Sequence, residues 1–256
     1  MRLHFQAQGQ GHPLLILHGF LGSLDNWRAM SKRLAKQFRV YALDLRNHGL
    51  SPHSDVMNYP VMARDVGELI AAEGLMPPYI LGHSMGGKVA MQFALQYPQS
   101  VAKLVVVDIA PKAYASSHMP LLLALRAVDL LAYRSFGEIG VALAGAVTDA
   151  ALRDFLLKNL TRDADQAFRW RIALDEIIRN YDSLTQAITA DRPFDKPACF
   201  IRGGRSSFVN DRDGASLGAL FPRAEIRTIA GAGHWLHFDA PEEFYSVVSN
   251  FLATPT

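Results

Sequence analysis

Short apolar runs alternate along this chain with segments whose apolar residues recur every three or four positions. This alternation is typical of βαβ units, in which a parallel sheet is covered by helices on both faces. The sequence therefore predicts an α/β fold with a mostly parallel central sheet. Strands are expected at 14–17, 40–43, 79–81, 104–107, 198–201 and 225–229, and helices at 27–36, 62–72, 88–97 and 242–251.

The alternation is interrupted between residues 112 and 190, where helical patterns occur without a convincing strand. The chain has 256 residues, of which 50% are hydrophobic, enough for one substantial core. It carries no internal repeat and no Gly/Ser-rich linker. We therefore expect a core formed by residues 1–111 and 191–256, with an all-helical cap, or lid, inserted at 112–190 before the second-to-last strand.

The amino-acid composition restricts the kinds of partner that this protein is expected to bind. Twenty-six basic residues nearly balance 24 acidic ones, with no long block of like charges, so nucleic acid is not expected. The apolar region 119–147 is interrupted by charged residues, which argues against a membrane span. Cys199 is the only cysteine, and the first residues lack the pattern of a signal peptide. A cytoplasmic protein with a small-molecule partner is predicted, as a monomer or a dimer.

The most specific motif is GHSMG at residues 82–86, directly after one expected strand and directly before a helix. It matches G-x-S-x-G, in which a serine on a sharp turn is held clear of the sheet and the glycines leave room for that turn. Ser84 is the candidate nucleophile, and the backbone N–H of Met85 can face a developing oxyanion. The alternative is an ordinary glycine-rich turn.

A second loop, in the sequence LILHGFLG at residues 15–22, follows the first expected strand. Because an oxyanion needs two N–H donors, we expect the second from Phe20, with Leu21 as the fallback. The Phe20 side chain would then line the pocket. His18 is interpreted as a structural residue that pins the loop by hydrogen bonds.

The candidate general base is His234, in GAGHW at residues 231–235, between the last expected strand and the last helix. A histidine on this loop can reach over the nucleophile, and the flanking glycines favour a tight loop. His237 is the competitor and could be a surface residue. The remaining histidines show no spacing typical of metal ligands, so no metal is implied.

Four segments together resemble a known family: DLRNHGLSP at 44–52, GHSMGGK at 82–88, VDIAP at 107–111 and GAGHW at 231–235. Over its whole length the chain resembles an α/β-hydrolase, and most closely the small bacterial esterases of the YbfF type. The resemblance implies the α/β-hydrolase fold and places residues 44–52 in a tight structural turn near the site. Asn47 stands where many relatives carry glycine.

In this family a catalytic triad consists of the nucleophile, the histidine and an acid. The acid is most commonly an aspartate a few residues after a glycine in the loop that follows the second-to-last strand, and this sequence differs from that pattern. Here this loop reads RGGRSSFV at 202–209, with serines at the expected position. Asp108, at the end of the strand after the nucleophile, is the preferred acid because its role requires only a hydrogen bond to His234. Asp211 is the alternative acid, and Asp108 could instead cap a turn.

These residues predict a serine esterase or thioesterase that acts through an acyl-enzyme, without a cofactor. Leu21, Phe208 and Trp235 are expected in a mainly apolar substrate pocket. Serine at position 84 excludes the relatives that need aspartate there. The alternatives are a hydrolase or lyase-type relative acting on carbon–carbon bonds and, from another class, a non-catalytic ligand-binding module.

Overall fold

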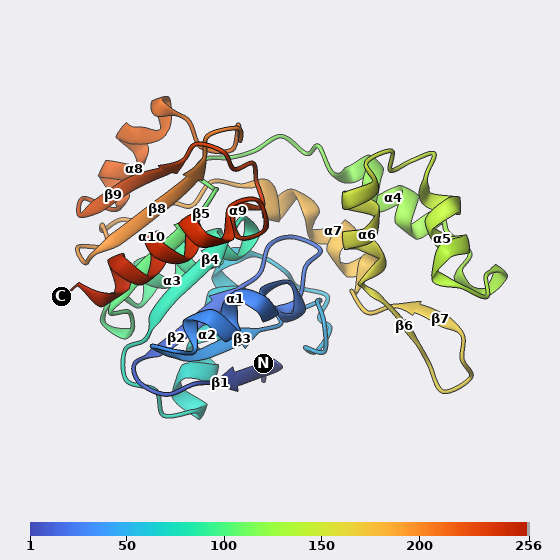
Figure 1. Cartoon of the computed structure of the whole chain (residues 1–256), viewed down its shortest axis with the longest axis horizontal. Coiled ribbons are helices and arrows are strands. Elements are labelled where there is room, and N and C mark those ends of the chain that lie inside the picture. The colour runs from blue at the N-terminus through green and yellow to red at the C-terminus, as the bar shows by residue number, and fades with distance from the viewer. Residues whose placement is uncertain (255–256) are drawn as a thin grey trace.

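A seven-stranded sheet forms the centre of the computed structural model, which describes residues 1–254 (Figure 1). The strand order is β1-β3-β2-β4-β5-β8-β9, and all neighbours pair in parallel except β1 with β3. The predicted mostly parallel sheet is confirmed. The strands are β1 (Phe5–Gln8), β2 (Pro13–Leu17), β3 (Arg39–Leu43), β4 (Tyr79–His83), β5 (Lys103–Val107), β8 (Ala198–Gly203) and β9 (Ala224–Ile229).

Strand β1 was not expected from the sequence. Its four residues, FQAQ, are half-buried or exposed, so they form no apolar run. It pairs along the edge of β3, and its short length and polar side chains are typical of an edge strand. The inner strands differ because both of their faces are covered, which explains why they appear in the sequence as continuous apolar runs.

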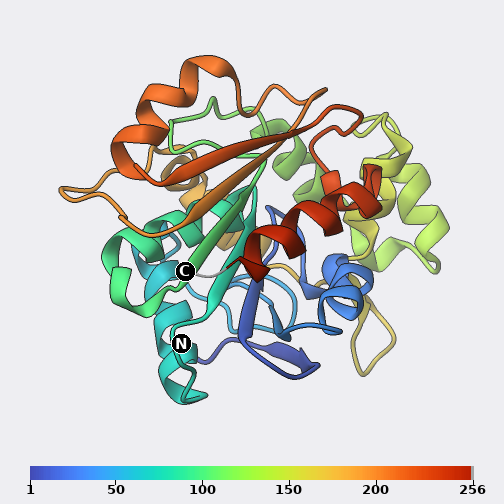
Figure 2. The ribbon, with the colours of Figure 1, turned by 60° about the vertical axis from the view of Figure 1, so that its left-hand side comes forward.

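Helices cover both faces of the sheet (Figures 1 and 2). Successive residues of β5 alternate between two apolar clusters: Val105 packs on the side of α1 and α10, and Leu104 on the side of α2 and α3. The helices of this core are α1 (Arg28–Leu34), α2 (Tyr59–Ala72), α3 (Met85–Gln96), α8 (Gly214–Leu220), α9 (Leu236–Asp239) and α10 (Pro241–Ala253), with 3₁₀ turns η1 (Leu24–Trp27), η2 (Pro98–Ser100) and η4 (Asp211–Asp213).

The segment between β5 and β8 stands to one side of the sheet (Figure 1). It contains α4 (Met119–Ala127), η3 (Leu130–Ala132), α5 (Phe136–Leu143), α6 (Ala150–Leu157), β6 (Leu160–Arg162), β7 (Phe168–Trp170) and α7 (Leu174–Thr185). The expectation of an all-helical segment is wrong, because β6 and β7 form an antiparallel hairpin. Strands of three residues are too short to show a period of two in the sequence. The boundaries at 112 and 190 stay a prediction.

Two short helices of this segment, α5 and α6, begin at side-chain caps. The side chain of Ser135 accepts a hydrogen bond from the N–H of Glu138 at the start of α5, and that of Asp149 accepts from the N–H groups of Ala151 and Leu152 at the start of α6. Both helices have eight residues and are too short to be stable without tertiary packing. Within residues 1–254 no helix is long and apolar enough to cross a membrane.

Candidate active site

Ser84 lies on the turn between β4 and α3 in a strained backbone conformation, with φ 52° and ψ −119°. The turn depends on its glycines. A Cβ on Gly82 would come within 2.2 Å of the Gly86 carbonyl oxygen, and one on Gly86 within 2.4 Å of the His18 and Leu17 carbonyl oxygens. The backbone of the preceding loop therefore packs directly against the turn that carries Ser84.

The two backbone N–H groups predicted as oxyanion donors are available. Met85 is the first residue of α3, where an N–H has no partner within the helix. The Phe20 N–H forms no hydrogen bond with any described residue. The fallback donor, Leu21, differs because its N–H donates to His48 Nε2 at 3.3 Å. This difference favours Phe20 over Leu21.

Two buried histidines hold the loop after β2. His18 Nε2 accepts from the Leu45 N–H at 3.0 Å, and its Nδ1 lies 2.8 Å from the Gly19 carbonyl oxygen, so His18 pins the loop as interpreted from the sequence. His48, in the neighbouring turn at residues 44–52, accepts a hydrogen bond from the Leu21 N–H. Burial lowers the pKa of His18 to about 4 and that of His48 to about 3. Both rings are therefore neutral near pH 7 and able to accept these bonds.

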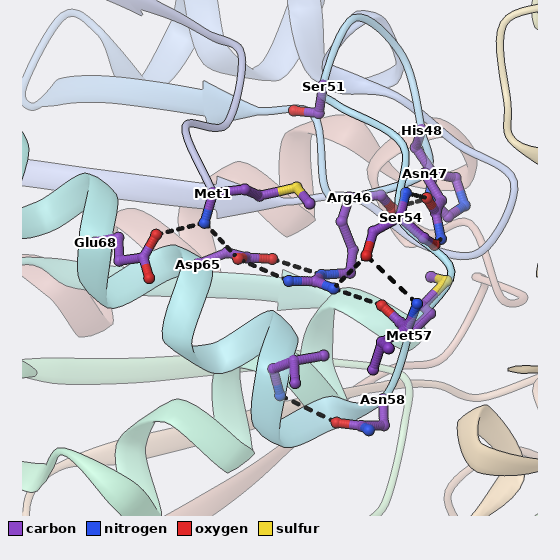
Figure 3. A network of polar contacts seen from close by, with 12 residues as sticks. Met1, Arg46, Asn47, His48, Ser51, Ser54, Met57, Asn58, Asp65 and Glu68 are labelled. Carbon is purple, nitrogen blue, oxygen red and sulfur yellow. Dashed lines mark hydrogen bonds and ion pairs between the residues drawn. The ribbon is translucent and has the colours of Figure 1, made fainter. Parts of the chain in front are cut away.

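The turn predicted at residues 44–52 is anchored from several directions (Figure 3). Asn47 has φ 64°, the left-handed conformation that favours glycine, and its side chain bonds the backbone of Ser54 at both ends. Arg46 holds both carboxylate oxygens of Asp65 on α2, at 2.6 and 2.8 Å. The Asn47 carbonyl accepts from the N–H of Ala173, which joins this turn to the segment between β5 and β8.

His234 and Asp108 are in contact. His234 Nδ1 lies 2.7 Å from Asp108 Oδ2, and the Gly203 N–H donates to Asp108 Oδ1 at 3.0 Å. The hydroxyl of Ser206 also donates to Oδ2. Asp108 is 1% exposed and has φ 51°, so its carboxylate is fixed among these donors. The contribution of Ser206 was not foreseen, although the serines at the position usual for the acid were a signal.

Asp211, the alternative acid, does not contact His234. Its side chain is 91% exposed and pairs with Arg202 at 2.7 Å at the start of η4. Of the two candidate acids, only Asp108 contacts His234.

Ser84 and His234 line the same cavity of about 100 Å³. No hydrogen bond joins their side chains within residues 1–254, and such bonds are often long before substrate binds. The ring of Phe208 stacks on His234 with centroids 4.0 Å apart, which limits the rotation of the imidazole. Leu21 and Trp235, both expected in the substrate pocket, line this cavity too, and Trp235 packs against Phe155 of α6.

A second, larger cavity of about 260 Å³ also reaches Ser84. Phe20, Met85 and Phe208 also border it, and its wall includes residues just before α4 and residues of α7. Lys88 carries the only formal side-chain charge among its described lining residues, apart from His118 when that ring is protonated. The cavities are called the large and the small cavity below. Ser84 therefore lies where two mainly apolar spaces meet.

His237, the competitor for the role of base, is not a surface residue, and that suggestion is wrong. Its side chain is buried and stacks on Trp27 with ring centroids 4.1 Å apart. Neither ring nitrogen has a partner among the described residues. Burial lowers the pKa of His237 to about 3. A neutral histidine ring without hydrogen bonds can be buried among apolar residues. The position of His237 soon after His234 therefore wrongly suggested an exposed side chain.

The chain is similar to known proteins in both sequence and structure. A family model described as alpha/beta hydrolase fold matches residues 12–137. A mouse protein named sn-1-specific diacylglycerol lipase ABHD11 is 37% identical over 94% of this chain and 80% of its own length. Esterase YbfF of Escherichia coli K12 is 33% identical over 96% and 95% of the two chains.

A solved structure titled marine microorganism esterase superposes with a TM-score of 0.95 at 41% identity, over 98% of this chain and 99% of that one. A coverage of 98% extends over most or all of the segment between β5 and β8. The chain belongs to the α/β-hydrolase family, in a group of carboxylic ester hydrolases.

Proposed function

We propose that this protein hydrolyses carboxylic esters through an acyl-enzyme, with Ser84 as nucleophile, His234 as general base and Asp108 as the acid of the triad. The observation that carries the proposal is the 2.7 Å contact between a buried Asp108 and His234, which lines the same cavity as the strained Ser84. Strain of this kind is retained where it presents a reacting group.

The contact with Asp108 orients the imidazole. If Nδ1 carries the proton shared with Asp108, Nε2 has a free lone pair with which to take the proton of Ser84. The Ser84 oxygen then bonds to the acyl carbon, and the carbonyl electrons move to the oxygen facing the N–H groups of Phe20 and Met85. When the carbonyl re-forms, the bond to the leaving oxygen breaks and His234 protonates that oxygen. A water molecule repeats the sequence and releases the acid.

The two cavities suggest how an ester is divided. The large cavity, about 260 Å³, is below the range of about 300–1,000 Å³ typical of drug-sized ligands, which favours acyl groups of short to medium length. The small cavity, bordered by Trp235 and Phe155, suits the alcohol or thiol that leaves. No cofactor takes part in this chemistry. The cytoplasmic location and the choice between monomer and dimer stay predictions.

The experiment measures hydrolysis of p-nitrophenyl esters from acetate to palmitate, with acyl-CoA thioesters in parallel. Wild type is compared with Ser84→Ala and with Ser31→Ala, whose hydroxyl is buried on α1 without a partner among the described residues. We expect Ser84→Ala to lose turnover and Ser31→Ala to keep it. A wild type that is inactive on every ester and thioester would contradict the proposal. That result would favour the alternatives, a hydrolase acting on carbon–carbon bonds or a ligand-binding module without catalytic activity.

A further inference from the structure

Lys88 is a buried cation that the proposed reaction does not use. It lies on α3 four residues after Ser84, and both residues line the large cavity. It is 1% exposed, and no carboxylate of residues 1–254 forms an ion pair with it. Because burying an ammonium group costs several kcal/mol, roughly, unless it finds partners, its contacts indicate its role.

The partners of Lys88 are two backbone carbonyls from distant parts of the sequence. Its Nζ donates to the Lys112 carbonyl at 2.8 Å and to the Gln186 carbonyl at 2.5 Å. Residue 112 lies where the chain leaves β5 for α4, and residue 186 where it returns from α7. We call residues 111–118 and 184–188 the two connectors. One ammonium group therefore joins both connectors to the helix that begins after Ser84.

The connectors also bond to each other around this point. The Tyr114 N–H donates to the Thr185 carbonyl at 2.9 Å, and the Ile188 N–H donates to the Pro111 carbonyl at 2.7 Å. The ring of Tyr114 lies 4.9 Å from Lys88 Nζ, close enough for a cation–π contact. Burial lowers the pKa of Lys88 to about 8, so the ammonium form with three N–H donors prevails near neutral pH.

The connectors form much of the wall of the large cavity. Its lining includes Tyr114, Ala115, Ser117, His118, Leu184 and Thr185, together with Ser84 and Met85. The distance between the nucleophile and this wall therefore depends on how the connectors are held against α3. We propose that Lys88 is a positioning residue that holds both connectors in place and so sets the length of the acyl group that the large cavity accepts. The part concerning acyl length rests on the proposed function.

Lys88→Met tests this role because methionine keeps an unbranched apolar side chain and removes all three donors. Lys103→Met is the matched control. Lys103 is also fully buried and also bonds carbonyls, those of Phe251 and Leu252 at the end of α10, away from both cavities. The two variants remove the same kind of interaction at different places.

The first readout is the ratio of kcat/KM for p-nitrophenyl decanoate to that for the butyrate. We expect the ratio to rise about tenfold in Lys88→Met, through KM more than kcat, because a released wall admits longer chains. Lys103→Met should keep the wild-type ratio even if it lowers Tm. An unchanged ratio in Lys88→Met, or the same change in both variants, would contradict the assignment of acyl length.

The second readout is amide hydrogen exchange at the connectors, which needs no activity. Exchange at Tyr114 and Ile188 should be faster in Lys88→Met than in the wild type and unchanged in Lys103→Met. Lys88→Gln, which keeps a shorter N–H donor, replaces Lys88→Met if that variant does not fold. Wild-type exchange in the Lys88 variant would overturn the role of Lys88 even in an active enzyme. Faster exchange in a protein without esterase activity would contradict only the proposed function.

Discussion

The sheet with its covering helices and the segment between β5 and β8 are built to different standards of packing. In the sheet, residues such as Leu104 and Val107 are 0% exposed, and the turn around Ser84 leaves no room for a Cβ on Gly82 or Gly86. In the other segment, Val141 is 77% exposed and the longest helix has twelve residues. The turn around Ser84 is therefore closely packed, whereas α5 leaves part of its apolar surface exposed.

The candidate site is divided along the same line. The residues proposed for the reaction, Ser84, Asp108 and His234, all follow strands of the sheet. The segment between β5 and β8 instead borders the cavities, through residues such as Tyr181 and Phe155. We infer that substitutions at the ends of the strands change the rate of the reaction, whereas substitutions in the segment change which ester is accepted.

The largest effect is expected for Asp108→Asn, because an amide cannot stabilise the imidazolium of His234 and can favour the wrong tautomer. We expect kcat to fall about 10⁴-fold, as removal of the acid does in other serine hydrolases. Asp211→Asn is the control, since Asp211 contacts Arg202 rather than His234. Steady-state kinetics of both variants on one ester decides, and equal losses in the two would contradict the choice of Asp108.

A smaller effect, on stability, is expected for Gly86→Ala. The new Cβ would meet two carbonyl oxygens at 2.4 Å, so we expect the free energy of unfolding to fall by about 3 kcal/mol. Gly145→Ala, between α5 and α6, meets nothing within 4 Å and should change it by less than about 0.5 kcal/mol. Urea unfolding measures both. Similar losses would break the contrast between the two regions.

Acid should weaken the sheet region through its buried histidines. Burial lowers the pKa of His18 to about 4 and that of His48 and His237 to about 3. Below about pH 6.5 the unfolded chain binds protons at these residues that the folded chain does not. Each group therefore removes about 1.4 kcal/mol of unfolding free energy per pH unit as the pH falls towards its folded pKa.

His237→Phe isolates one of these groups. The variant removes two ring nitrogens that have no partner among the described residues and keeps an aromatic ring against Trp27. Its unfolding free energy should depend less steeply on pH between about 6.5 and 4, by one proton. Denaturant unfolding across this range is the measurement, and a slope equal to that of the wild type would show that His237 does not contribute.

The smallest effect is expected in the segment beside the small cavity. Phe155→Ala removes a ring that lines the small cavity beside Trp235. We expect kcat/KM for esters of aromatic alcohols to fall about fivefold, because the alcohol loses about 1 kcal/mol of aromatic contact with that ring. Methyl esters should be affected less. Val141→Ala, on an exposed face of α5, is the control. A uniform loss on all esters would contradict a role restricted to the leaving group.

The sequence was most informative where one residue type has few alternatives. Gly82 and Gly86 mark the turn of Ser84 because a larger residue collides there, and the apolar runs mark strands buried on both faces. Contacts between distant segments leave no such local pattern. Three features could therefore be seen only in the structure: the hairpin of β6 and β7, the burial of His237 and the carbonyl partners of Lys88. The sequence favoured Asp108 over Asp211 as the acid, but only the structure shows which of them contacts His234.

Covalent labelling with a fluorophosphonate, followed by mass spectrometry of the peptides, tests directly whether Ser84 is the nucleophile. We expect one adduct, on Ser84, that disappears in Ser84→Ala and forms much more slowly in His234→Ala, because the hydroxyl then lacks its base. Hydrolysis of esters by a wild type that is labelled elsewhere, or not at all, would contradict the assignment of Ser84 as nucleophile.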